Sequence, residues 1–182
     1  MKHLVSLACL LALGTAGCGG ARAADTHTET ALANVGGEMS KRISVVFFDL
    51  GDTLVTGETR PKTWIPGANA VLEGLRDKGV RIGVISNTGE LTRSELLEIL
   101  PPDFDFGLFE EALVVLSSEV QVSKPDPEIF LEAVKRAGVT AGETLFVGES
   151  LEETLAAQGV GMKAARVHNF PDDWSTILDA SG

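Results

Sequence analysis

Four apolar segments of this sequence each lead into polar residues that could do chemistry. In chain order these residues are Asp49, Ser86, Lys124, Glu149 and Glu153. An aspartate can attack phosphorus, while a serine hydroxyl and a lysine ammonium can bind phosphoryl oxygens. Paired carboxylates supply the oxygen ligands that suit Mg²⁺. The set therefore predicts phosphoryl transfer, in which the protein supplies an attacking oxygen, neutralises phosphoryl oxygens and holds a metal ion.

The apolar segments before these residues have the composition of strands, and helical segments alternate with them. Strands are predicted over 43–48, 80–85, 112–117, 144–147 and 163–167. Strand–helix alternation is typical of a parallel sheet, whose ligands bind at the carboxyl ends of its strands. The predicted fold class is therefore α/β, a Rossmann-like three-layer sandwich with a mainly parallel five-stranded sheet. Asp49 followed by Gly51 could also mark only a turn.

Helix boundaries can be read from glycine, proline and capping residues. Helices are predicted over 68–78, 90–100, 127–137 and 171–178. Asp126 is a good N-cap for the third of these, and Gly79 and Gly138 stand where helices end. The last helix is expected to bury Trp174 and Ile177.

Four short segments share their order and spacing with the motifs of a known enzyme superfamily. They read FFDLGDTL, VISN, VSKPDPEIF and FVGESLEE. The chain thus resembles the haloacid dehalogenase-like (HAD) phosphohydrolases, from residue 43 to about residue 168. The resemblance implies a Mg²⁺-dependent phosphomonoester hydrolase that acts through an aspartyl-phosphate on Asp49.

The resemblance also assigns roles to residues. Asp49 would be the nucleophile, with Ser86 and Lys124 as its catalytic partners. Ser86, Asn87 and Lys124 would bind the phosphate. Ser86 could instead be only a turn residue, and Lys124 only a surface base.

A Mg²⁺ site is implied in the same way. Asp49 would bind the ion through its carboxylate, and Gly51 through its main-chain carbonyl. Glu149 would complete the metal shell, and Glu153 would act through a water molecule. Acidic residues such as Glu153 are also favoured in the first turn of a helix for reasons unrelated to metal binding.

Two departures from the family pattern bear on activity. The usual second aspartate, two residues after the nucleophile, is Gly51 here, and general acid–base catalysis of that kind contributes about 10²–10⁴ in rate. Asp52 comes one residue later, and its side chain need not point into the site. The fourth motif has Glu149 and Glu153 where aspartate is usual. An alternative therefore stays open, namely a catalytically degenerate HAD module that binds a phosphorylated ligand or protein without turnover.

The spacing between motifs leaves no room for the cap domain that many family members insert. Such an open site either accepts bulky or macromolecular phosphates or is covered by a partner subunit in a homo-oligomer. The expected partner is a phosphorylated small molecule or a phosphoprotein. The one local lid candidate is the segment 56–64, for which we expect a solvated loop with Trp64 packed against the protein.

The N-terminal segment reads as a leader. We expect a signal peptide over 1–23, and the residues before Cys18 resemble a lipoprotein-type cleavage site, which would make Cys18 a lipidated N-terminus. A flexible tether is expected over 24–42. The HAD-like core would then cover 43–182, and the protein would be periplasmic or lipid-anchored in the cell envelope. If translation starts instead at Met39, the protein is cytoplasmic.

Composition limits the partners. The 182 residues carry a net charge of −11 and no basic run, which argues against a nucleic-acid binder. The sequence has no cluster of histidine and cysteine, so a zinc site is not expected. Membrane association is expected only through the N-terminal lipid anchor.

Overall fold

The structure is a computed structural model that describes residues 42–168 and 172–181. The predicted signal peptide, the lipid attachment at Cys18, the alternative start at Met39 and nearly all of the predicted tether lie outside these residues. In the part that is described, no helix combines the length and the apolar character needed to cross a membrane.

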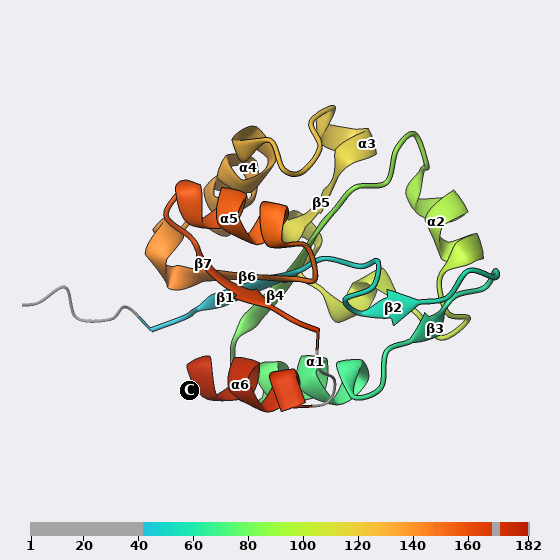
Figure 1. Cartoon of the computed structure of the whole chain (residues 1–182), viewed down its shortest axis with the longest axis horizontal. Coiled ribbons are helices and arrows are strands. Elements are labelled where there is room, and N and C mark those ends of the chain that lie inside the picture. Colours follow the sequence, from blue (N-terminus) through green and yellow to red (C-terminus); the bar gives the residue numbers. More distant parts are fainter. Residues whose placement is uncertain (1–41, 169–171, 182) are drawn as a thin grey trace, which may run out of the picture. The chain divides into compact units, whose positions relative to one another are not determined.

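A parallel sheet of five strands runs through the centre of the fold, as predicted (Figure 1). In spatial order the strands are β5 (Val114–Leu116), β4 (Arg81–Ser86), β1 (Val45–Phe48), β6 (Thr144–Gly148) and β7 (Lys163–Arg166). Every residue of β1 is buried, as expected for the middle strand of a sheet that is covered on both faces. β1 pairs with β4 on one side and β6 on the other, so Val45 lies between Arg81 and Thr144.

Helices cover both faces of this sheet, which confirms the predicted three-layer sandwich. The helices are α1 (Ala68–Asp77), α2 (Arg93–Ile99), α3 (Ser117–Val120), α4 (Pro127–Ala137), α5 (Leu151–Gly159) and α6 (Asp172–Ala180). Short 3₁₀ turns occur at Phe106–Leu108, Glu111–Leu113 and Ala141–Glu143. α1 and α6 lie on one face of the sheet, and α4 and α5 lie on the other (Figure 1).

The alternation of side chains along β1 divides the core into two clusters, one for each face. Phe48 lies in the cluster formed with α1 and α6, where its ring centroid is 6.4 Å from that of Trp174. Phe47 lies in the other cluster, together with Phe130 of α4. The predicted burial of Trp174 and Ile177 is confirmed.

The caps predicted for two helices are confirmed. The Asp126 carboxylate accepts the main-chain N–H of Glu128 (2.9 Å), and Pro127 fills the first position of α4. Gly79 and Gly138 have φ of 72° and 68°, in the left-handed region that glycine adopts without a steric clash.

Most predicted bounds differ from the structure by one to three residues, and two of the differences have a clear physical cause. α2 was expected from Glu90 but begins at Arg93, because Thr92 and Glu95 form a capping box in which each side chain accepts the other's main-chain N–H (3.3 and 2.8 Å). The strand expected to reach Ser117 ends one residue earlier, and Ser117 opens α3 instead. Its hydroxyl accepts a main-chain hydrogen bond from the loop after β4 (2.8 Å), which ties the two segments together.

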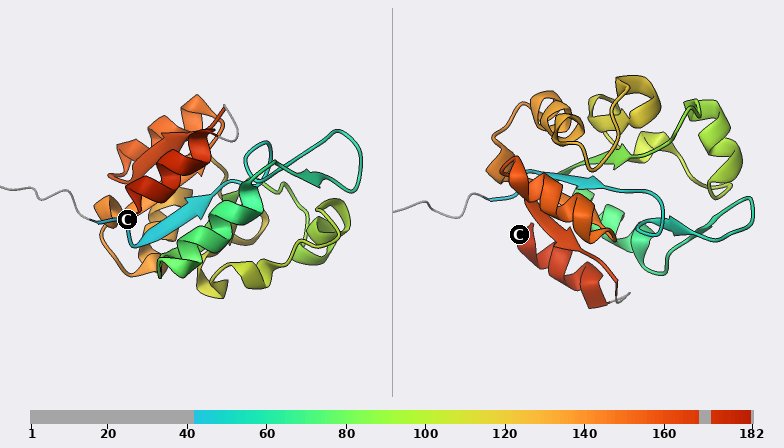
Figure 2. Two further views of the ribbon diagram at one scale, coloured as in Figure 1. Left: turned by 90° about the horizontal axis from the view of Figure 1, so that it is seen from below. Right: turned by 45° about the horizontal axis from the view of Figure 1, so that its top comes forward.

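The predicted lid segment is a small hairpin rather than a loop. β2 (Val55–Thr56) pairs antiparallel with β3 (Thr63–Trp64), and the N–H of Lys62 donates to the Ile99 carbonyl of α2 (2.8 Å). Figure 2 shows the hairpin and α2 at the same end of the sheet in both views. Trp64 packs as predicted, with its ring stacked 5.3 Å from that of Phe104. Between the first and third motifs, all of which the structure describes, the chain forms this hairpin and short elements but no cap domain.

Candidate active site

Asp49 is the first residue after the central strand β1. Its N–H donates to the Val147 carbonyl of β6 (2.9 Å), which extends the ladder and fixes the carboxylate at the carboxyl end of the sheet. From β1 the chain proceeds to β4 on one side and later to β6 on the other, so Asp49 lies at the topological switch point. Open α/β sheets bind their ligands in the crevice at that point.

Lys124 reaches Asp49 from the segment before α4. Its Nζ lies 2.6 Å from Asp49 Oδ1 and 2.9 Å from Glu153 Oε2, and it sits 5.3 Å from the Phe146 ring centroid. Only 4% of Lys124 is exposed, so the alternative of a surface base is wrong. A buried ammonium between two carboxylates is instead part of an ionic site.

Asn87 holds Lys124 in place. Its Nδ2 donates to the Lys124 carbonyl (2.8 Å), and its Oδ1 accepts the Lys124 N–H (2.7 Å). The sequence predicts that Asn87 binds phosphate, but both ends of its side-chain amide contact the main chain of Lys124. We therefore reassign the Asn87 side chain as a positioning group.

Ser86 is the last residue of β4 and is buried, with 5% of its surface exposed. Its main chain pairs with Leu116 of β5, so the interpretation of Ser86 as only a turn residue is wrong. In the pairing of β1 with β4, Phe48 lies beside Val84. Asp49 follows Phe48 and Ser86 comes two residues after Val84, so both lie at the carboxyl edge of the sheet.

Thr53 links two of the carboxylates, and sequence reasoning missed it. Its Oγ1 donates to Glu149 Oε2 (3.0 Å) and lies 3.5 Å from Asp49 Oδ2, at the outer limit for a hydrogen bond. The side chain is fully buried in the turn that follows Asp49. The only signal in the sequence was a hydroxyl residue within the first motif, four positions after the nucleophile.

Negative charge exceeds positive charge in this site. Burial raises the pKa of Asp49 to about 6; Lys124 opposes that increase, and Glu149 and Glu153 add to it. Glu153 Oε2 lies at ion-pair distance from Lys124 but is buried and accepts no aligned hydrogen bond. One ammonium thus faces the carboxyl groups of Asp49, Glu149 and Glu153, a donor set that suits a divalent cation.

The predicted Mg²⁺ ligands are only partly assembled. Among the residues that the structure describes, no three acidic, histidine or cysteine side chains form a cluster ready to hold a metal. Mg²⁺ is usually held by one or two carboxylates and several waters rather than by a complete protein cage, so Asp49, Glu149 and the Gly51 carbonyl fit it. Glu153 is engaged by Lys124, in keeping with a role through water.

The expected acid–base group is missing from this site. A Cβ atom placed on Gly51 would meet nothing within 4 Å, so the space that an aspartate would fill is open. Asp52 is exposed, and its carboxylate accepts a hydrogen bond from the Thr56 hydroxyl (2.7 Å). In this structure the Asp52 side chain is thus directed to Thr56, and no contact between it and Asp49 is found.

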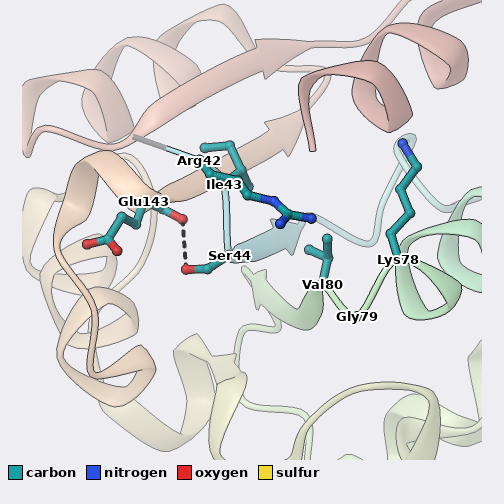
Figure 3. A pocket seen from close by; sticks show the side chains of 7 residues that line it. All are labelled: Arg42, Ile43, Ser44, Lys78, Gly79, Val80 and Glu143. Atoms are coloured by element: carbon teal, nitrogen blue, oxygen red, sulfur yellow. Dashed lines mark hydrogen bonds between the residues drawn. The ribbon is translucent and has the colours of Figure 1, made fainter. Parts of the chain in front are cut away.

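A pocket of about 440 Å³ lies at the opposite edge of the sheet, where β1 and β4 begin (Figure 3). Arg42 and Lys78 line it, and Ser44 Oγ donates to the Glu143 carbonyl there (3.4 Å). Lys78 Nζ is bonded to the Leu178 carbonyl of α6 (2.5 Å). None of the predicted site residues lines this pocket, and we do not assign it to the chemistry.

Comparison with known families shows which family the chain belongs to. Residues 59–161 match the family model of the haloacid dehalogenase-like hydrolases. The chain belongs to this family. The curated relatives that it resembles include phosphatases.

Two relatives illustrate the similarity. The glyceraldehyde 3-phosphate phosphatase of Pyrococcus abyssi is 40% identical over 100 residues, which cover 54% of this chain and 40% of that protein. The haloacid dehalogenase-like hydrolase domain-containing protein 3 of Mus musculus is 35% identical over 136 residues, covering 72% of this chain and 49% of the other. This haloacid dehalogenase-like hydrolase thus spans less than half the length of these relatives.

Solved structures agree on the fold. A HAD family enzyme from Bacteroides thetaiotaomicron, crystallised with magnesium and inorganic phosphate, superposes with a TM-score of 0.60 at 20% identity. The match covers 74% of this chain and 98% of that one. A HAD phosphatase from Thermococcus onnurineus is 30% identical, with a TM-score of 0.51 over 61% of this chain and 49% of the other.

Proposed function

We propose that this protein is a Mg²⁺-dependent phosphomonoester hydrolase that uses Asp49 as its nucleophile. The observation that carries the proposal is the buried ion pair of Asp49 and Lys124 at the carboxyl end of the central strand. A carboxylate in that place can reach phosphorus, and the ammonium beside it can neutralise phosphoryl oxygens. The phosphatases among its relatives and the magnesium and phosphate bound by a protein of the same fold support this interpretation.

The reaction would proceed in two displacements. An Asp49 carboxylate oxygen attacks phosphorus, the bond from phosphorus to the leaving-group oxygen breaks, and the electron pair departs with that oxygen. Water then attacks the aspartyl-phosphate, releases inorganic phosphate and returns the Asp49 carboxylate. Lys124 and the Ser86 hydroxyl would bind phosphoryl oxygens throughout, with Asn87 holding Lys124 in position.

Asp49, the Gly51 carbonyl and Glu149 would hold Mg²⁺, with Glu153 acting through water. When bound, the ion would offset the excess of negative charge in the site and stabilise charge on the phosphoryl oxygens. Thr53 would orient Glu149 through its hydrogen bond of 3.0 Å. The open site, which has no cap domain among the described residues, suits a phosphorylated small molecule or a phosphoprotein.

A second candidate is a degenerate module that binds phosphorylated ligands without turnover. Gly51 and the outward-facing Asp52 favour it, because the chain then lacks a general acid and base. The complete set of Asp49, Ser86 and Lys124 favours the hydrolase, since binding alone does not require a nucleophile.

The deciding experiment uses the full-length chain, an aryl phosphate whose leaving group needs no protonation, and Mg²⁺. Asp49→Asn is the control, because it keeps the shape of the side chain and removes the nucleophile. Metal-dependent turnover that Asp49→Asn abolishes supports the hydrolase. If a folded protein shows no turnover above this control but still binds inorganic phosphate, the binding module is the better description.

A further inference from the structure

An apolar pocket of about 140 Å³ opens beside the candidate active site. Gly51 and Ser86, both members of that site, form part of its lining. The remaining lining is mostly aliphatic and comes from the turn after Asp49, from β2 and from the region of α2. These side chains are Leu50, Val55, Leu91, Leu96, Ile99 and Leu100.

Apart from Ser86, whose hydroxyl is assigned to the phosphate, the polar side chains that line this apolar pocket already make hydrogen bonds. The Asn87 amide is bonded to the main chain of Lys124, and the Thr88 hydroxyl donates to Ser118 (2.9 Å). Lys62 Nζ donates to the Gly57 carbonyl (2.9 Å). A sugar placed here would bury hydroxyls against aliphatic side chains without hydrogen-bond partners, which costs free energy.

The size of the apolar pocket matches one six-membered ring. A cavity of about 150 Å³ lined by leucine, isoleucine and phenylalanine stays dry and binds benzene. The hydrogen bond between Lys62 and Ile99 joins the hairpin to α2 along one wall and so helps to keep the pocket formed.

The missing acid points to the same kind of substrate. With Gly51 in place of an acid, no side chain at that position protonates the departing oxygen. A phenol has a pKa of about 10 and can leave as phenolate, whereas an alcohol has a much higher pKa and requires a proton. Pocket geometry and leaving-group chemistry are independent observations, and both favour an aromatic leaving group.

We propose that the apolar pocket receives the aromatic ring of an aryl phosphomonoester, and that aryl phosphates rather than sugar phosphates are the substrates of this hydrolase. The inference rests on the proposed nucleophilic role of Asp49. Attack by Asp49 breaks the bond from phosphorus to the phenolic oxygen, the electron pair leaves on that oxygen, and solvent protonates the phenolate. Hydrolysis of the aspartyl-phosphate then completes the turnover.

Binding of two non-hydrolysable phosphonates to the full-length chain with Mg²⁺ tests the pocket apart from the chemistry. Phenylphosphonate and methylphosphonate share the anionic group and differ in the ring. By calorimetry we expect phenylphosphonate to bind about 10- to 100-fold more tightly, because only it buries a ring. In turnover, cyclohexyl phosphate should have a much lower kcat than phenyl phosphate, and hexose 6-phosphate should have a higher KM than cyclohexyl phosphate.

A pair of variants on α2 tests whether the apolar pocket causes the tighter binding of phenylphosphonate. Ile99→Ser changes the lining of the apolar pocket, whereas Leu97→Ser changes a side chain of the same helix that is 44% exposed and does not line it. Ile99→Ser should weaken the binding of phenylphosphonate about 3- to 10-fold and leave the binding of methylphosphonate unchanged. Leu97→Ser should change neither affinity. Thermal melting checks that Ile99→Ser is folded; if it is not, the phosphonate comparison on the unmodified protein decides.

Equal affinity for the two phosphonates would overturn the pocket proposal, and so would a higher kcat/KM for hexose 6-phosphate than for phenyl phosphate. In either case, turnover that Asp49→Asn abolishes would leave the proposed hydrolase intact. If neither phosphonate binds and no phosphate ester is hydrolysed, both proposals fail.

Discussion

Lys124 Nζ lies 2.6 Å from Asp49 Oδ1 in a buried ion pair that joins the central strand to the segment before α4. The two residues are 75 positions apart in the chain, and the pair exists because β1 and that segment meet at the carboxyl edge of the sheet. The same ammonium lies 2.9 Å from Glu153, so it restrains two carboxylates together.

Replacing Lys124 by methionine removes the charge and keeps the length of the side chain. We expect kcat/KM for an aryl phosphate to fall by about 10² or more, as for the loss of one preorganised charged donor. The acid limb of the pH profile should move to higher pH, because Lys124 lowers the pKa of Asp49. Lys135→Met, at a side chain that is 80% exposed, is the control. Activity within about threefold of the unmodified protein would contradict the role given to Lys124.

Thr53→Val tests the link between Thr53 and Glu149. Valine fills the same buried space but cannot donate to Glu149, so the apparent Kd for Mg²⁺ should rise about 10-fold. Thr56→Val removes a hydroxyl that donates to the exposed Asp52, and it should leave Mg²⁺ binding unchanged. Magnesium titration of turnover, together with calorimetry, measures both. Identical Mg²⁺ affinities for the two variants would contradict the role of Thr53 in orienting Glu149.

Gly51→Asp should restore the missing acid and base. A Cβ atom at this position meets nothing within 4 Å, and the backbone lies outside the left-handed region, so a residue with a side chain is tolerated there. We expect kcat for an alkyl phosphate to increase by about 10² or more. Asp52→Asn, at the neighbouring exposed carboxylate, is the control and should leave the rate unchanged. A Gly51→Asp protein that is folded and no faster would show that another group already provides this function.

The unmodified protein should release phenol from phenyl phosphate in a burst. The first displacement needs no acid, but hydrolysis of the aspartyl-phosphate lacks the base that activates water, so the intermediate should accumulate. Stopped-flow measurement should show up to about one equivalent of phenol per protein before a slow steady state. Gly51→Asp should abolish the burst by accelerating the second step. A linear time course in the unmodified protein would place the slow step before phenol release.

The raised pKa of Asp49 makes stability depend on pH when no metal is bound. The ordinary pKa is 3.8 and the folded value is about 6, so the folded protein keeps this proton to higher pH than the unfolded chain does. The resulting stability is fully present below about pH 4 and is lost as the pH rises through about 6, by up to about 3 kcal/mol.

Chemical denaturation between pH 4 and 7 checks this directly. The free energy of unfolding of Asp49→Asn, relative to the unmodified protein, should increase across that range, because asparagine does not ionise. Asp77→Asn, at an exposed position on α1, is the control, and its free energy of unfolding should change with pH in the same way as that of the unmodified protein. Added Mg²⁺ should recover the stability of the unmodified protein at pH 7 and have little effect on Asp49→Asn. A constant difference between the two proteins from pH 4 to 7 would contradict the raised pKa.

Much of the architecture was predictable from local patterns. Strands such as Val45–Phe48 combine buried apolar residues with β-branched and aromatic side chains, and α4 begins and ends where Asp126 and Gly138 predict. Local signals failed where a side chain made a hydrogen bond that the strand or helix pattern did not predict. Thr92 caps α2, which therefore begins later than predicted. Ser117 lies outside the observed strand, and its hydroxyl accepts a hydrogen bond from the loop after β4.

The sequence by itself determined the sheet, the helices around it, and the chemical types placed at the strand ends, because propensity and periodicity are properties of neighbouring residues. Only the tertiary structure decided how those groups act on one another. The contact between Thr53 and Glu149 and the hydrogen bonds of Asn87 to the main chain of Lys124 depend on segments that meet through folding. The pKa of Asp49 has the same origin, since desolvation and the charges around a carboxylate are set by its surroundings in space and not by its neighbours in the chain.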